Sequence, residues 1–161
     1  MSRKADESVA ESTSVRTSAL VGRYDHALDP KKRLTIPSEW RELMGNPGYI
    51  YAMPDRRERC VNLIPMADMD VWLDKIRAQS LFDPAMNAVL QTIGQNSYLL
   101  SFDSQGRIRI CDKLLQFANL TTTVAMVGSV KMIKVWDPAA LSPADAVDQA
   151  ALDAAMSALP F

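Results

Sequence analysis

The segments DPKKRLTI at 29–36 and DSQGRIRI at 103–110 decide how this 161-residue chain is organised. They lie 74 positions apart, and the same offset brings further residues into register. The identical pairs are Tyr24 with Tyr98, Asp29 with Asp103, Arg33 with Arg107 and Ile36 with Ile110. Around them the order of predicted elements also repeats: a strand, an Asp-x-x-x-Arg turn, a strand, a short helix and a hairpin. We interpret this pattern as an internal duplication.

Each copy predicts short strands and one short helix, and a helical segment joins the two copies. In the first copy Pro37 suits the first position of a helix over 38–44, and apolar runs at 49–53 and 60–64 form a hairpin. Residues 66–95 place apolar side chains at three- and four-residue intervals, which is typical of helix, and Asp83-Pro84 is a helix-start signal. The predicted fold class is α+β and rich in β-strand.

The predicted organisation has five parts. They are a disordered arm over 1–20, a first repeat over 22–69, connecting helices over 70–95, a second repeat over 96–139 and an Ala/Asp-rich tail over 140–161. The arm is polar and lacks apolar periodicity, which is typical of disorder. The tail has a thin apolar stripe, so we expect a marginal helix there.

Composition narrows the class of protein. The polar N-terminus does not resemble a secretory signal, and no apolar run approaches the roughly 20 residues that cross a bilayer. Two cysteines and one histidine cannot supply a Cys/His zinc site, so we expect no metal and no cofactor. We therefore expect a soluble, cytoplasmic protein.

The net charge is −1, but the positive charge is concentrated in the repeats. Residues 22–137 hold 15 Lys/Arg against 13 Asp/Glu. The basic groups cluster at 31–33, at 56–59, and at Arg107 with Arg109. A nearly neutral domain can bind DNA when its positive groups share one face.

The Asp-x-x-x-Arg turns carry the candidate site. We expect Asp29 and Asp103 to accept backbone amides of the turns they begin, with Gly106 supplying a permissive backbone in the second turn. Side chains alternate across a strand, so Leu34 and Ile108 should face the core while the flanking arginines face outward. Guanidinium suits bidentate contact with guanine or phosphate, although an arginine could instead pair with its own aspartate.

We expect the cysteines, the histidine and two of the tryptophans to have structural roles and no catalytic role. We expect Cys60 and Cys111 to be small buried apolar side chains and His26 to be a structural histidine. Trp40 and Trp72 are predicted to anchor packing. The sequence offers no nucleophile–base pair, metal cluster or phosphate loop, so we expect no enzymatic activity.

Three segments together resemble the MraZ family of bacterial transcription regulators: ALDPKKRLTIPSEWREL at 27–43, FDSQGRIRICDKLLQFANL at 102–120 and VGSVKMIKVWDP at 127–138. The resemblance covers roughly 22–140. It implies two SpoVT/AbrB-type swapped-hairpin domains, in which the strands of the two copies interleave. The chain departs from the family pattern at Lys32, where glycine is usual, at Cys111, where proline is usual, and in its N-terminal arm.

The resemblance also implies a function. It implies sequence-specific binding to double-stranded promoter DNA by a ring-shaped homo-oligomer. The oligomer would recognise direct repeats upstream of the division and cell-wall gene cluster. The protein would be located in the cytoplasm, at the nucleoid. Arg33 and Arg107 would lie at the DNA, Lys31 and Lys32 would neutralise phosphates, and Arg109 would assist. Two alternatives remain: an antitoxin-like DNA-binding interaction protein, and an oligomeric scaffold without DNA binding.

Overall fold

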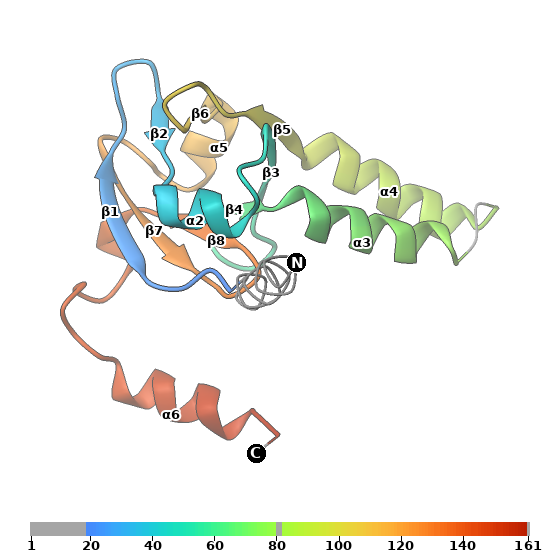
Figure 1. The fold of residues 1–161 in the computed structure, drawn as a ribbon. Helices are drawn as coiled ribbons and strands as arrows, with labels where there is room; N and C mark the ends of the chain where they lie inside the picture. The colour runs from blue at the N-terminus through green and yellow to red at the C-terminus, as the bar shows by residue number, and fades with distance from the viewer. Residues whose placement is uncertain (1–18, 80–81, 161) are drawn as a thin grey trace, which may run out of the picture.

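The computed structural model of the chain describes residues 19–79 and 82–160 (Figure 1). The arm predicted over 1–20 therefore lies outside the described residues except at its end. At that end Leu20 is buried and pairs with Val130 through two backbone hydrogen bonds of 2.8 and 2.9 Å. Ordered structure thus includes the last residue assigned to the arm.

The two repeats fold into matching sets of elements, as their sequences predict. The first repeat contains β1 (Arg23–Ala27), β2 (Arg33–Thr35), α2 (Ser38–Leu43), β3 (Tyr49–Pro54) and β4 (Val61–Ile64). The second contains β5 (Tyr98–Ser101), β6 (Arg107–Arg109), α5 (Asp112–Phe117), β7 (Thr123–Gly128) and β8 (Ile133–Trp136). Pro37 precedes α2 as its cap residue and is not the first helical residue, a shift of one position from the prediction.

The strands of the two repeats interleave. A six-stranded antiparallel sheet has the order β1-β7-β8-β4-β3-β5, and a separate pair joins β2 to β6. Hence β1 pairs with a strand of the second repeat, and β5 pairs with a strand of the first. This exchange confirms the tandem swapped-hairpin architecture and the α+β class.

The core forms where the exchanged elements meet. As the alternation predicts, Leu34 and Ile36 of the first repeat and Ile108 and Ile110 of the second are almost fully buried. Trp40 of α2 is also buried, and its indole Nε1 donates to the Val21 carbonyl at 2.9 Å. Both repeats therefore supply one shared core, which fixes the two Asp-x-x-x-Arg turns relative to each other.

The connecting segment is a helical hairpin that projects from the strand-rich body (Figure 1). It consists of α3 (Met66–Arg77) and α4 (Pro84–Asn96), and Asp83 caps α4 by accepting the Ala85 amide at 2.9 Å. Trp72 does not anchor packing within the chain, because 41% of it is exposed on α3. The periodicity correctly predicts helix, but Met69 is the only buried residue of α3 and α4 has none.

The tail forms a short 3-10 helix, η1 (Pro138–Ala140), and a nine-residue helix, α6 (Gln149–Ser157). Figure 1 shows α6 apart from the body, and its apolar side chains Leu152 and Met156 are exposed. Among the described residues no helix is long and apolar enough to span a membrane.

Candidate nucleic-acid interface

Each Asp-x-x-x-Arg turn is organised by its aspartate in the same way. Oδ1 of Asp29 accepts the backbone amides of Lys31 at 2.9 Å and Arg33 at 2.8 Å. Oδ1 of Asp103 accepts the corresponding amides of Gln105 and Arg107, both at 2.9 Å. The predicted turn-structuring role of the two aspartates is therefore present in the geometry, with Gly106 in the second turn.

The arginine of each turn pairs with the aspartate of the same turn. Arg33 Nε lies 2.6 Å from Asp29 Oδ2, and Arg107 Nε lies 2.7 Å from Asp103 Oδ2. In both carboxylates the pKa is lowered, first by the hydrogen bond from the arginine's backbone amide and then by its side chain, against an opposing effect of desolvation. The carboxylates thus stay ionised at neutral pH and hold each guanidinium through Nε.

The two turns meet because β2 and β6 pair. Leu34 lies opposite Ile108 in the buried layer, while Arg33 lies opposite Arg109 and Thr35 opposite Arg107. The ladder continues beyond the strands, since the Ile36 amide donates to Gly106 and the Ile110 amide donates to Lys32, both at 3.0 Å. Residues 74 positions apart in the sequence are thereby brought to one edge of the molecule.

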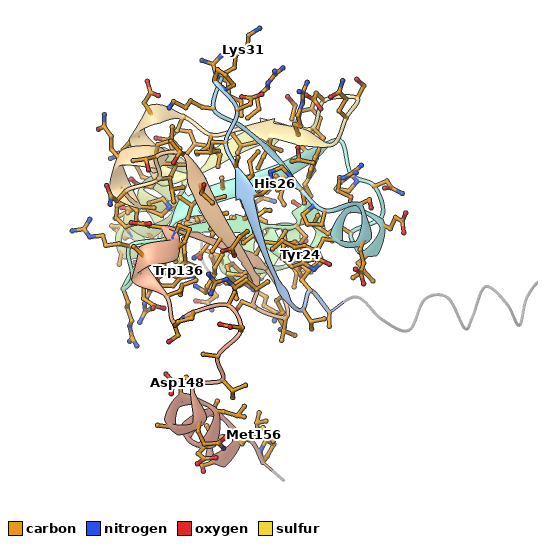
Figure 2. The ribbon with its side chains drawn as sticks, turned by 90° about the vertical axis from the view of Figure 1, so that its left-hand side faces the viewer. Tyr24, His26, Lys31, Trp136, Asp148 and Met156 are labelled. Atoms are coloured by element: carbon orange, nitrogen blue, oxygen red, sulfur yellow. The ribbon has the colours of Figure 1, made fainter. Side chains whose placement is uncertain are left out.

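That edge is strongly cationic. It gathers all five cations predicted from sequence, which are Lys31, Lys32, Arg33, Arg107 and Arg109. The two lysines and Arg109 are exposed, whereas Arg33 and Arg107 keep 32% and 23% of their side chains exposed. Figure 2 shows Lys31 at one end of the molecule, and Met156 of α6 with its cap residue Asp148 at the opposite end. We call these five residues, with Asp29 and Asp103, the basic edge.

The two turns differ at their fourth position. Lys32 has a φ of 62°, in the left-handed region, and the equivalent Gly106 has a φ of 75°. Only glycine adopts this region without a steric cost, so Lys32 is strained by about 1–2 kcal/mol. The departure from the family pattern therefore preserves the backbone of the turn and places a cation on it.

Sequence reasoning missed one residue at this edge, Arg41 of α2. Its guanidinium covers Gly106 of the other repeat, which is buried, and its Nε donates to the Ile36 carbonyl at 3.0 Å. A signal was present in the repeat alignment, where Arg41 corresponds to Leu115. A charged residue aligned with an apolar residue marks a position where the two repeats differ in role.

The second basic cluster, 56–59, lies at the tip between β3 and β4 and away from the β2–β6 ladder in the pairing scheme. Asp55 organises this tip by accepting the amides of Arg57 at 2.9 Å and Glu58 at 3.0 Å. Burial opposes its ionisation and is the largest single effect, but the hydrogen bond from Lys134 Nζ at 2.7 Å and those from Arg57, Asn62 and Glu58 together outweigh it and hold the pKa of Asp55 well below its usual range. Arg59 stacks on Phe117 with its Cζ 5.0 Å from the ring centroid. These contacts give Asp55 and Arg59 structural roles within the tip.

The two thiols and the histidine differ in burial. Cys60 is buried, as predicted, and burial raises the pKa of its thiol to about 11, so it is a poor nucleophile. Cys111 is only half-buried. His26 is exposed on β1, and its Nδ1 lies 3.1 Å from the adjacent Ala27 carbonyl. Within the described part of the chain, no three His, Cys, Asp or Glu side chains are grouped to hold a metal.

The interleaved strands and the paired Asp-x-x-x-Arg turns define a tandem AbrB-type swapped-hairpin protein. Comparison with known proteins agrees with this class. Residues 93–150 match the family model described as "MraZ protein, putative antitoxin-like". Similar proteins include the transcriptional regulator MraZ of Thermomicrobium roseum, 31% identical with 73% of this chain and 81% of the relative covered, and that of Dictyoglomus thermophilum, 33% identical with 72% and 77% covered. The protein of the same name from Spiroplasma kunkelii is 32% identical, with 74% and 82% covered. The chain belongs to the MraZ family.

Proposed function

We propose that this chain is a sequence-specific DNA-binding transcriptional regulator that uses the basic edge to contact promoter DNA, without a cofactor and without catalysis. The observation that carries the proposal is the register of β2 and β6, which sets Arg33 directly opposite Arg109. Like charges opposite each other destabilise a strand pair. Asp29 pairs with Arg33, but Arg109 forms no ion pair among residues 19–79 and 82–160, which leaves a cost in the free protein. An anionic ligand at this edge would offset that cost.

The two kinds of cation suit different contacts with DNA. Lys31, Lys32 and Arg109 are exposed, which suits contact with phosphates. Arg33 and Arg107 are held through Nε by the aspartates of their own turns, and Nη1 of Arg107 also lies 4.0 Å from Asp29 Oδ2 of the other turn. The remaining guanidinium nitrogens suit contact with guanine or phosphate. Because the carboxylate fixes each side chain in advance, less conformational entropy is lost on binding.

Oligomerisation would extend the same contact along DNA. One chain supplies only a few cations, and several aligned chains would give the multiple contacts that make binding tight. We propose a homo-oligomer, with a ring as the form that the family resemblance implies, reading direct repeats upstream of the division and cell-wall gene cluster. Such a protein would work in the cytoplasm at the nucleoid. The exposed side chains of Val71, Trp72 and Val89 on the helical hairpin support contact between copies.

A second candidate is an antitoxin-like interaction protein that also binds DNA. The description of the matching family model favours it, and so does the tail. In α6 apolar Leu152 and Met156 are exposed on a helix whose only charged residue is Asp153, and the helix lies at the end of the molecule opposite Lys31 (Figure 2). Co-purification of a toxin-sized protein that no longer occurs when 141–161 is deleted would establish this candidate.

The proposal is tested by measuring affinity for a duplex of the chain's own promoter and for a scrambled duplex of equal length, across a salt series. We expect tighter binding to the promoter duplex and a steep decrease of affinity with salt. Lys31→Ala should weaken binding to both duplexes alike and reduce the salt slope by about one unit, because the variant neutralises one phosphate fewer. No binding at low salt would instead favour an oligomeric scaffold without DNA binding, and equal affinity for the two duplexes would contradict sequence-specific binding.

A further inference from the structure

Arg41 occupies an unusual position for a charged side chain. It is half-buried against the backbone of Gly106, where an ideal Cβ would lie only 2.7 Å from Nη1 of Arg41 and closer still to Cζ. Its Nε is tied to the Ile36 carbonyl at 3.0 Å, and the Ile36 amide in turn donates to the Gly106 carbonyl. The first repeat therefore places a guanidinium on the turn of the second repeat.

This guanidinium has no carboxylate partner within 4.0 Å among residues 19–79 and 82–160. By contrast, Arg33 and Arg107 of the basic edge each have such a partner, in Asp29 and Asp103. Partly buried charges in proteins are usually paired, because desolvation otherwise penalises them. An unpaired cation at the edge proposed to meet DNA is suited to an anion from outside the chain.

The equivalent position in the other half shows what the guanidinium replaces. There the residue corresponding to Arg41 is Leu115, which is buried, and the residue corresponding to Gly106 is Lys32, which is exposed. The backbone contact is the same, since the Ile110 amide donates to the Lys32 carbonyl at 3.0 Å. Each turn thus carries one cation at its fourth position, supplied by the turn itself in one repeat and by α2 in the other.

We propose that Arg41 is a phosphate-binding residue of the second turn, filling the role that Lys32 fills in the first, an inference that rests on the proposed DNA binding. Arg41 and Gly106 then form a unit. Glycine leaves the space into which the guanidinium fits, and the guanidinium restores the positive charge that the glycine lacks.

A cycle of variants tests this unit: Arg41→Leu, Gly106→Lys, and the two combined, which gives the second turn the pair of residues that the first turn has in Lys32 and Leu115. Arg77→Leu is the matched control, because it removes the same charge from an exposed site on α3. For each full-length protein we would measure the thermal midpoint and the affinity for the promoter duplex across a salt series.

We expect Arg41→Leu to reduce the salt slope by about one unit and to weaken binding to promoter and scrambled duplexes by the same factor. Arg77→Leu should leave the slope unchanged. Gly106→Lys should lower the thermal midpoint, since its side chain collides with Arg41. In the double variant the collision is gone and a lysine replaces the missing charge, so the midpoint should recover in part and the slope should return to that of the wild type.

Two results would overturn the proposal. One is a folded Arg41→Leu protein with the wild-type slope, and the other is a double variant no better than the sum of its single changes. Arg41→Lys covers the case in which Arg41→Leu does not fold, because it keeps the charge and should keep the slope; a reduced slope there counts against the assignment. Failure of DNA binding itself is distinguishable, since the unmodified protein and Arg77→Leu would then also show none.

Discussion

The turns DPKKR at 29–33 and DSQGR at 103–107 share one backbone but differ in where their charge comes from. Both use an aspartate that accepts two amides and one arginine, with distances that agree within 0.1 Å between the copies. The first turn then carries its own extra cation on a strained Lys32, whereas the second has a relaxed Gly106 covered by Arg41. The duplication has kept geometry more strictly than sequence, which makes the turns suitable for direct comparison by mutation.

The largest effect is expected where the two turns are most alike, in the layer beneath them. Leu34 and Ile108 face each other across β2 and β6, and both are fully buried. Leu34→Ala and Ile108→Ala should each lower the free energy of unfolding by about 2–5 kcal/mol, measured by urea denaturation. Val147→Ala on the exposed tail serves as the control. If one of the two core variants lowers the free energy of unfolding by less than about 1 kcal/mol, the two turns do not depend equally on the same buried layer.

The second largest effect is expected in DNA binding, where the two turn arginines should contribute unequally to specificity. Arg33→Ala and Arg107→Ala should each cost about 1–3 kcal/mol of binding free energy for promoter DNA and relax the preference at one base position. We expect Arg107 to contribute more to specificity, because glycine at 106 lets the backbone approach DNA closely. Affinities for single-base variants of the promoter duplex measure this. Unchanged preference in both folded variants would assign discrimination to DNA shape or to residues 56–59.

A smaller effect exposes the strain in the first turn. Lys32→Gly removes a side chain held at a positive φ, so it should raise the free energy of unfolding by about 1 kcal/mol. The same change removes a cation and should reduce the salt slope of DNA binding by about one unit. Stability and affinity therefore change in opposite directions. A variant less stable than the wild type would show that Lys32 makes a compensating contact.

The smallest effect concerns the start of α5. Cys111 corresponds to Pro37 of the first repeat, and its φ of −72° already suits proline. Cys111→Pro should therefore raise the free energy of unfolding by about 0.4–1 kcal/mol through a more restricted unfolded chain. Cys111→Ala is the control for removal of the half-buried thiol. Lower stability for the proline variant would mean that the two helix starts differ in backbone more than in sequence.

Local chemistry makes most of the fold and part of the site predictable from sequence. The turn aspartates, the outward arginines and the buried Leu34 and Ile108 follow from alternation and from the hydrogen-bonding habit of aspartate. The exchange of β1 and β5 between repeats follows only from the family resemblance, because no local pattern encodes pairing between strands so far apart. Arg41 escaped prediction for the same reason, since its contact with Gly106 joins two repeats.

At two further places the contacts in the structure add to what the sequence predicts. The helical spacing of Trp72 predicts burial, but periodicity does not say whether a neighbouring surface exists within the chain. For Arg33 and Arg107 the sequence leaves two interpretations, contact with DNA or pairing with their own aspartates. The ion pair within each turn uses Nε, and Arg107 Nη1 lies 4.0 Å from Asp29 of the other turn, so part of each guanidinium remains for DNA and the two interpretations do not exclude each other.

The interleaving of strands has a consequence for synthesis of the chain. Arg23 pairs with Val127, so β1 waits about 100 residues for its partner, which at about 5–20 residues per second takes on the order of 5–20 s on the ribosome. For much of that interval β3 also lacks β5 at its edge, and β2 lacks β6. Unpaired strand edges invite aggregation. A chain that terminates early in α4 would therefore be a substrate for cellular quality control and would not persist as a half-sized regulator.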